Sequence, residues 1–322
     1  MKYFAHVNAK TLDEAVSTMQ RYGGRAKPIA GGTDLLGIIK DRILPTYPEC
    51  LVNLKTIPGL DFIEEQDGAL RIGALTRLED IANAPTVKSK YIALAEATHR
   101  TASPHIREMG TIGGNLCQDI RCWYYRSQNN RFPCLRKGGG RCYAIDGENR
   151  YHSIFGASTE GGCLAVHPSD TAPALIALDA RIKTSKRTIN AEDFFQVDVT
   201  KTTVLDYDEI VTEIEVPKPA GKTAFIKFAT RKSIDFPIIN CAAAIASEGG
   251  RVKAARICLN AVYVKPYRAT KAEEAIIGKA INEANAEAAG DAAVSSAQPL
   301  TYNEYMVQIA KTIVKRTIMA CK

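Results

Sequence analysis

Short apolar runs alternate with amphipathic segments over the first 55 residues. A capping box at 11–14 precedes apolar positions spaced three and four residues apart, which predicts a helix that Gly23 can end. Apolar runs predict strands at 27–30 and 51–54, and a second helix is expected at 35–40. This order predicts a small β-α-β unit with a glycine turn after one strand.

A hairpin pattern follows this unit. Strands are expected at 62–64 and 70–72, joined by a turn that contains the Asp-Gly pair at 67–68. Helical spacing then predicts helices at 78–84 and 92–99.

Between residues 117 and 163 the apolar residues follow neither the helical nor the strand period, and Cys, Arg, Gly, Asn and Tyr dominate. A structureless stretch of this length within a compact domain is uncommon, and it is usually functional or disordered. A bound inorganic centre would supply the order that a missing apolar core cannot.

Regular pattern resumes at Ser169 and Asp170, which resemble an N-cap before a helix at 174–178. Pro217 and Pro219 indicate a boundary near residue 217. After the N-cap the pattern predicts strands at 210–216, 224–230, 238–245 and 254–262, and helices at 269–288 and 304–319.

Composition and charge narrow the class of protein. The chain has 322 residues, of which 46% are hydrophobic and 24% charged, as is usual for a globular protein with two or three subdomains. No apolar run approaches the ~18 residues of a membrane helix, and the N-terminus lacks a signal-peptide pattern, so a cytoplasmic protein is expected. The net charge of +7 is too small and too dispersed to indicate nucleic-acid binding.

Two glycine turns with polar ends are candidates for binding an anion. They read Ala-Gly-Gly-Thr-Asp at 30–34 and Thr-Ile-Gly-Gly-Asn at 111–115. Glycines allow backbone N–H groups to converge on an anion, and Thr33, Thr111 and Asn115 would add side-chain donors. Two such turns suit a pyrophosphate held from both sides, although neither fits the G-x-G-x-x-G fingerprint and each alone resembles an ordinary turn.

Nine cysteines are an odd number, and the chain is long enough to bury a core without disulfides. Five of the nine lie between residues 117 and 163, where metal or redox chemistry is the more frequent explanation. Residues 121–150 carry seven cations against two carboxylates, which would offset the cost of burying an anionic cluster. Four of these cysteines, which are separated by 11, 7 and 20 residues, are considered as ligands of one metal centre: Cys122, Cys134, Cys142 and Cys163. These spacings favour an iron–sulfur cluster, while structural zinc and a solvated loop with free thiols remain open.

Six segments carry a family resemblance: PIAGGTDLL at 28–36, IGALTRLEDI at 72–81, ASPHIREMGTIGGNL at 102–116, HPSDTAPALIALDA at 167–180, DEIVTEIEVP at 208–217 and FIKFATRKSIDFP at 225–237. Taken together, they resemble the flavin-binding medium subunit of the xanthine dehydrogenase/molybdenum hydroxylase family. The segment GGNLCQD-x-RC at 113–122 and the cysteine-rich insertion after it resemble the β subunit of 4-hydroxybenzoyl-CoA reductase most.

The resemblance implies an α+β fold. A two-subdomain FAD-binding domain of the PCMH type would cover residues 1–57 and 58–216, with an iron–sulfur loop inserted at 117–165. Residues 217–322 would form a C-terminal domain with a small antiparallel sheet and helices.

The resemblance also implies residues for two cofactors, FAD and a [4Fe–4S] cluster. The cluster ligands would be Cys122, Cys134, Cys142 and Cys163, with Cys117 as an alternative to Cys163. Asp170 would reach the ribityl or phosphate region, Val211 would pack on the adenine or ring side, and Lys227 would approach the isoalloxazine. The full set implied for FAD is Ile29, Ala30, Gly31, Gly32, Thr33, Asp34, Leu35, Thr101, Thr111, Gly114, Asn115, Asp170, Val211 and Lys227.

The implied function is electron transfer rather than substrate chemistry. A large molybdopterin subunit and a small [2Fe–2S] subunit would be partners, and ferredoxin would deliver electrons for removing a phenolic hydroxyl from an aromatic-CoA thioester. Two alternatives stay open. One is a flavin subunit of a hydroxylase or dehydrogenase acting on another aromatic or heterocyclic compound, and the other is a zinc-stabilised binding protein without a redox role.

Overall fold

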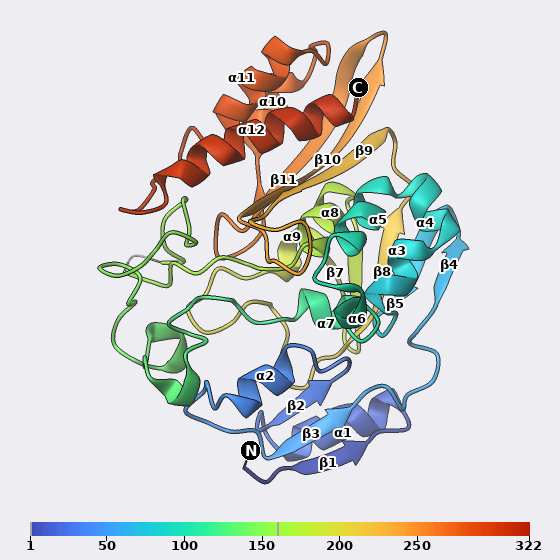
Figure 1. The fold of residues 1–322 in the computed structure, drawn as a ribbon. Coiled ribbons are helices and arrows are strands. Elements are labelled where there is room, and N and C mark those ends of the chain that lie inside the picture. Colours follow the sequence, from blue (N-terminus) through green and yellow to red (C-terminus); the bar gives the residue numbers. More distant parts are fainter. Residues whose placement is uncertain (1, 160) are drawn as a thin grey trace.

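The computed structural model describes residues 2–159 and 161–322 and contains three separate sheets. In Figure 1 the N-terminal sheet, the five-stranded sheet and the C-terminal sheet follow one another from the bottom of the view to the top. This architecture confirms the α+β class. Among the helices of the described residues, none has both the length and the apolar character needed to cross a membrane.

The N-terminal unit is a three-stranded parallel sheet in the order β1-β3-β2, as the β-α-β prediction requires. The capping box is confirmed, because the backbone N–H of Glu14 donates to Thr11 Oγ1 at 3.1 Å. The pattern missed the first strand. The elements are β1 (Ala5–Asn8), α1 (Leu12–Arg21), β2 (Ala26–Ile29), α2 (Leu35–Lys40) and β3 (Cys50–Asn53).

The five-stranded sheet is antiparallel, in the order β4-β5-β8-β6-β7. Its first hairpin is confirmed, since Asp67 and Gly68 have the positive φ angles, 53° and 76°, that a tight two-residue turn requires. The pattern missed two strands and several short helices. The elements are β4 (Ile63–Gln66), β5 (Ala69–Gly73), α3 (Leu78–Asn83), α4 (Pro85–Lys90), α5 (Ile92–His99), α6 (Pro104–Arg107), α7 (Ile112–Leu116), α8 (Thr171–Ala177), β6 (Arg181–Thr184), β7 (Thr188–Asn190), α9 (Ala191–Phe194) and β8 (Val211–Pro217).

The cysteine-rich segment, residues 117–165, has little regular structure. Its described residues contain only two short 3₁₀ turns, η1 (Gln128–Asn130) and η2 (Leu135–Lys137). A small apolar cluster supports it, in which Ile38 and Ile43 of the N-terminal unit pack against Ile120. The prediction of an aperiodic region is therefore confirmed.

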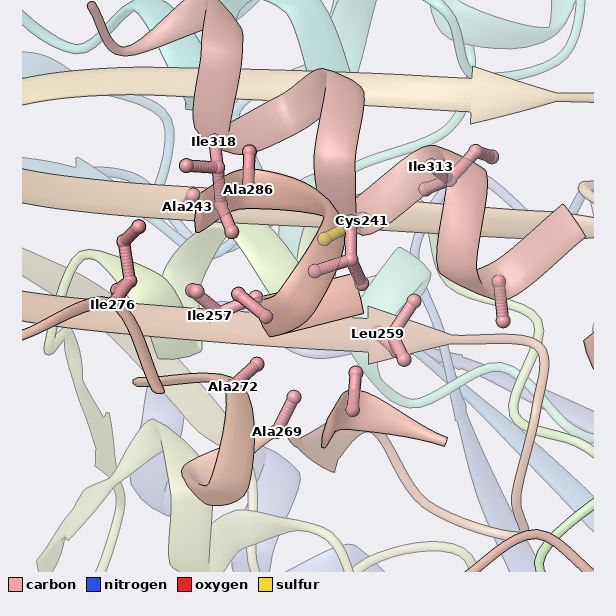
Figure 2. Packing of buried hydrophobic residues seen from close by; sticks show 14 of the residues in the cluster. Cys241, Ala243, Ile257, Leu259, Ala269, Ala272, Ile276, Ala286, Ile313 and Ile318 are labelled. Carbon is pink, nitrogen blue, oxygen red and sulfur yellow. The ribbon is translucent and has the colours of Figure 1, made fainter. Parts of the chain in front are cut away.

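The C-terminal domain is a four-stranded antiparallel sheet, in the order β12-β11-β10-β9, covered by helices. Figure 2 shows the apolar side chains that fill the space between this sheet and its helices. On the other side, α5 and α8 contact the sheet through small residues such as Ala93, Ala174 and Ala242. The elements are β9 (Lys222–Phe228), β10 (Ile239–Glu248), β11 (Arg251–Asn260), β12 (Tyr267–Arg268), α10 (Thr270–Ile276), α11 (Glu283–Ala293) and α12 (Glu304–Ala320).

The single helix expected at 269–288 is wrong. The helix ends at Ile276, and Gly278 takes a left-handed φ of 77°. The backbone there pairs with β11, because Gly278 N donates to Val252 O at 2.8 Å and Val252 N donates to Lys279 O at 2.9 Å. Asn282 then caps a new helix, α11. Strand pairing therefore outcompetes the continuous helical pattern.

Candidate functional site

A cleft of about 950 Å³ lies where the two glycine turns meet. The turn at 30–34 leads from β2 into α2, and the turn at 111–115 begins α7. Among the residues implied for FAD, those that line the cleft are Ile29, Ala30, Gly31, Gly32, Thr33, Asp34, Leu35, Thr101, Thr111, Gly114, Asn115 and Asp170.

The glycines allow the two turns to touch. A Cβ atom on Gly31 would stand 1.9 Å from the carbonyl oxygen of Met109, so no larger residue fits there without moving the backbone. Gly32 has a φ of 71°, which favours glycine. Thr111 caps α7 by accepting a hydrogen bond from Gly114 N at 3.2 Å. The two turns therefore pack closely against each other and form one wall of the cleft.

Asn115 connects this wall to the start of α8. Its Oδ1 accepts hydrogen bonds from Ser169 Oγ at 2.6 Å and Thr171 Oγ1 at 2.7 Å. Because the oxygen is used in this way, the amide N–H groups are the atoms left for a ligand in the cleft. Ser169 Oγ also accepts a hydrogen bond from Ala172 N. Of the two residues expected to cap this helix, Ser169 therefore provides the capping side chain and Asp170 does not.

Asp170 is a buried carboxylate on the cleft wall, supported from behind by Lys227 and Asn240. Lys227 Nζ donates to its Oδ2, and Asn240 Nδ2 donates to its Oδ1, both at 2.7 Å. Burial raises the pKa of Asp170, and the adjacent Lys227 ammonium acts against that rise. Lys227 also donates to Arg100 O at 3.0 Å. It therefore contacts Asp170 and is not itself part of the cleft wall.

Val211 lies elsewhere. It begins β8, is 7% exposed, and packs in the apolar core behind the five-stranded sheet. The structure therefore brings the glycine-turn residues together with Thr101 and Asp170, and leaves Val211 and Lys227 off the cleft wall.

Several residues of the cleft wall are not among the predicted site residues, and Arg121 and Phe236 are two of them. Arg121 lies there, with its guanidinium 4.5 Å from the ring centroid of Phe236. Burial lowers the pKa of Arg121 to about 10. In the sequence Arg121 counted only as one charge of a basic segment, and no pattern in the sequence distinguishes it from the other cations there.

The second site is a small cavity lined by Cys122, Cys134, Cys142 and Cys163. Cys117 does not line it and lies instead on the wall of the larger cleft. Burial raises the pKa of the Cys122 thiol to about 12 and that of Cys163 to about 11. His152 Nε2 stands 3.3 Å from Cys122 Sγ, and Ala165 N donates to Cys163 Sγ at 3.4 Å.

The four cysteines of this cavity do not form a ready-made site for a metal. Within residues 2–159 and 161–322, no three His, Cys, Asp or Glu side chains form a group that could hold a metal ion. This finding applies to zinc and to an iron–sulfur cluster alike, so what the cavity shows is that the four thiols share one space.

Most cations of the cysteine-rich segment face inward. Arg121 and Arg126 pair with Asp34, at 2.7 and 2.8 Å. Further into the segment, Arg136 lies near Asp119, Lys137 Nζ donates to Ile43 O, and Arg150 pairs with Glu148. In the described part of the chain only Arg131 and Arg141 of these seven cations lack such partners, and each lies over an aromatic ring. Most of the excess positive charge of this segment is therefore paired within the protein, and little of it forms a basic surface.

Comparison with known proteins gives matches over the whole chain. The family described as the FAD binding domain in molybdopterin dehydrogenase matches residues 2–219, and the CO dehydrogenase flavoprotein C-terminal domain matches residues 224–321. The aldehyde oxidoreductase FAD-binding subunit PaoB of Escherichia coli (strain K12) is 35% identical, covering 97% of this chain and 96% of that protein. The carbon monoxide dehydrogenase medium chain of Hydrogenophaga pseudoflava is 28% identical, covering 98% and 96%.

Solved structures agree with these matches. A chain of the carbon monoxide dehydrogenase structure from Hydrogenophaga pseudoflava superposes with a TM-score of 0.77 at 28% identity, covering 99% of this chain and 97% of that one. A chain of quinoline 2-oxidoreductase from Pseudomonas putida 86 superposes with a TM-score of 0.76 at 25% identity, covering 100% and 98%.

Proposed function

The chain belongs to the FAD-binding medium subunits of the CO dehydrogenase/xanthine oxidase family. We propose that it relays electrons through FAD and, because of its cysteine-rich segment, also through an iron–sulfur centre of its own. Like its relatives, it is the FAD subunit of a molybdenum hydroxylase-type heteromeric dehydrogenase. The iron–sulfur centre is the part of this function that goes beyond the family.

The single observation that carries the proposal is the cavity shared by four cysteines. In a [4Fe–4S] cluster each thiolate binds its own iron, so the four sulfurs surround a cube instead of meeting at one ion. Cys122, Cys134, Cys142 and Cys163 line one cavity, and from there each would reach one iron of such a cluster. Arg136, which also lines the cavity and has a side chain only 2% exposed, brings a positive charge toward an anionic cluster.

FAD fits the larger cleft. The turn at 30–34 would hold its pyrophosphate with backbone N–H groups, and the turn at 111–115, whose N–H groups at 112–115 already donate within the protein, would add the Thr111 hydroxyl and the Asn115 amide. Asp170, positioned by Lys227, would contact the ribityl or phosphate region. Bound there, FAD supplies the exchange between paired and single electrons, while the protein positions it and tunes its potential.

Partner subunits would carry the remaining chemistry. We propose a large molybdopterin subunit that binds the substrate and a small [2Fe–2S] subunit, in keeping with relatives that are named as a medium chain and as a subunit of a dehydrogenase complex. A ferredoxin would exchange electrons at the cysteine cavity. An exposed aromatic group beside it supports such a contact: Trp123, which follows Cys122, is 50% exposed and lies 5.6 Å from the ring of Tyr151.

Oxidation of an aldehyde, or of an aromatic or heterocyclic compound, is the direction we favour. The relatives above are named for aldehyde oxidation, carbon monoxide oxidation and quinoline oxidoreduction. Reduction of an aromatic-CoA thioester, as in 4-hydroxybenzoyl-CoA reductase, is the second candidate, and the cysteine-rich insertion with its four-cysteine cavity is the observation that favours it.

The test is metal and flavin analysis of the complex purified without oxygen, followed by turnover assays. We expect four irons and one FAD for each copy of this chain beyond the irons of the small subunit, and reduction of the bound flavin by aldehydes or heterocycles. Zinc in place of iron would contradict the cluster. Turnover restricted to aromatic-CoA thioesters with reduced ferredoxin would establish the second candidate instead.

A further inference from the structure

Asp34 ends the first glycine turn, yet its carboxylate points toward the cysteine-rich segment. Its Oδ1 forms an ion pair with Arg121 Nη2 at 2.7 Å and accepts a hydrogen bond from Arg126 Nη2 at 2.8 Å. Its Oδ2 accepts a bond from the backbone N–H of Asp119 at 2.9 Å. The carboxylate makes no capping bond to α2, at whose N-cap it stands. Both oxygens are thus occupied by donors that lie 85 to 92 residues further along the chain.

All three partners of the Asp34 carboxylate belong to residues 119–126, which bracket Cys122. Arg126 holds this segment in shape, since its Nε donates to Ile120 O at 2.7 Å and its Nη2 to Asp119 O at 2.9 Å. Arg121, the covalent neighbour of Cys122, has its guanidinium on the wall of the FAD cleft. The first cysteine of the cavity and a charged group of the cleft are therefore adjacent residues, and one carboxylate holds both in place.

Contacts continue from Asp119 to the cysteine cavity. The Asp119 carboxylate accepts a hydrogen bond from the Tyr125 hydroxyl and lies 3.6 Å from Arg136 Nη2. Tyr125 and Arg136 both line the cavity. An unbroken series of polar contacts thus runs from the glycine turn through Asp34 and Asp119 to the walls of the metal site.

From this series we infer that Asp34 is a positioning residue that couples the two cofactor sites. Occupation of the cysteine cavity fixes residues 119–126, and these in turn hold the glycine turn and present Arg121 to the cleft. FAD then binds more tightly to the iron-loaded protein than to the iron-free protein, and by reciprocity bound FAD helps the cavity to retain its cluster. The inference rests on the proposed function for the identity of the two occupants.

The first experiment is a thermodynamic cycle on the intact complex. FAD affinity is measured by titrating the flavin-depleted complex in four forms: the natural sequence, Cys134→Ser to remove iron, Asp34→Asn, and the double variant. We expect Cys134→Ser to weaken FAD binding about fivefold in the natural background, at the lower end of ordinary coupling between sites. In the Asp34→Asn background, loss of iron should leave FAD affinity unchanged, which a purely structural role of Asp34 would not produce.

Two control variants separate coupling from general destabilisation. Glu213→Gln removes a carboxylate of β8 that, like Asp34, pairs with two cations, Arg71 and Lys183. It should lower stability and leave the fivefold coupling intact. Arg121→Lys should retain more of the coupling than Arg121→Gln, because it keeps the charge in the cleft. Equal FAD affinity of iron-loaded and iron-free protein in the natural background would overturn the inference.

A second experiment does not depend on iron. Hydrogen exchange of residues 119–126 is followed with and without FAD. FAD should slow exchange there in the natural sequence and leave it unchanged in Asp34→Asn. If the complex contains no iron, the proposed cluster fails on its own. If FAD gives no protection of residues 119–126, the coupling fails whatever occupies the cavity.

Discussion

The cysteine-rich segment and the C-terminal domain reach their structures by opposite means. In the C-terminal domain, apolar side chains such as Ile257 and Leu259 alternate along long strands and pack against three helices. In the cysteine-rich segment, described residues form two 3₁₀ turns, a small apolar cluster and a network of buried charges. The first region is held by the hydrophobic effect, which periodicity encodes, and the second by specific polar contacts and, as we propose, by a bound cluster.

The largest expected effect comes from removing one cysteine ligand. Cys134→Ser should abolish the iron content of this chain and make residues 117–165 sensitive to protease, while the C-terminal domain stays folded because its core takes only Ile154, with Phe155 packed against it, from that segment. Iron analysis and limited proteolysis give the two readouts. Retention of all four irons would contradict the ligand set.

Creating a cavity in the C-terminal core should lower the stability of the protein and leave its iron content unchanged. Ile257 is fully buried in β11, so Ile257→Ala should lower the free energy of unfolding by about 2–5 kcal/mol, through lost burial and the space left behind. Denaturant titration measures this loss. Iron and FAD for each folded chain should remain as they are in the natural protein, and a drop in iron would show that the two regions are not independent.

Acid should destabilise the region where the segment joins the rest of the fold. His167 is fully buried, and burial lowers its pKa to about 3 from an ordinary value of 6.5. Below pH 6.5 the unfolded chain binds a proton at this histidine, whereas the folded chain does not do so until the pH nears 3. The free energy of unfolding therefore falls as the pH drops from 6.5 toward 3, by at most about 1.4 kcal/mol for each pH unit. His167→Phe should remove that contribution. Thermal melts should then show a smaller difference in melting temperature between pH 7 and pH 5.5 than they show for the natural protein.

The smallest effect is expected at the surface of the cysteine-rich segment. Because only Arg131 and Arg141 among its seven cations lack a polar partner in the described structure, neutralising both to Gln should slow electron exchange with a ferredoxin only a few-fold, and less at high salt. Stopped-flow rates at two ionic strengths measure this. Rates that never depend on ionic strength would contradict electrostatic docking.

Local signals were sufficient for much of the fold. The capping box before α1, the Asp-Gly turn between β4 and β5, and the long strands β10 and β11 depend on neighbouring residues, so they could be predicted from the pattern. The break between α10 and α11 could not, because it depends on the pairing of Gly278 and Lys279 with Val252 of a neighbouring strand. Tertiary hydrogen bonds override a helical pattern at that point.

The candidate sites divide along the same line. The sequence by itself determined the two glycine turns and the four cysteines, because these depend on residue type: glycine where a Cβ cannot fit, and sulfur where a metal would bind. Only the tertiary structure decided that the turns meet in one cleft, that Cys117 lines that cleft instead of the four-cysteine cavity, and that Asp34 pairs with Arg121 and Arg126. The direction of a charged side chain depends on partners far along the chain, since buried charge is stable only where the fold supplies its counter-charge.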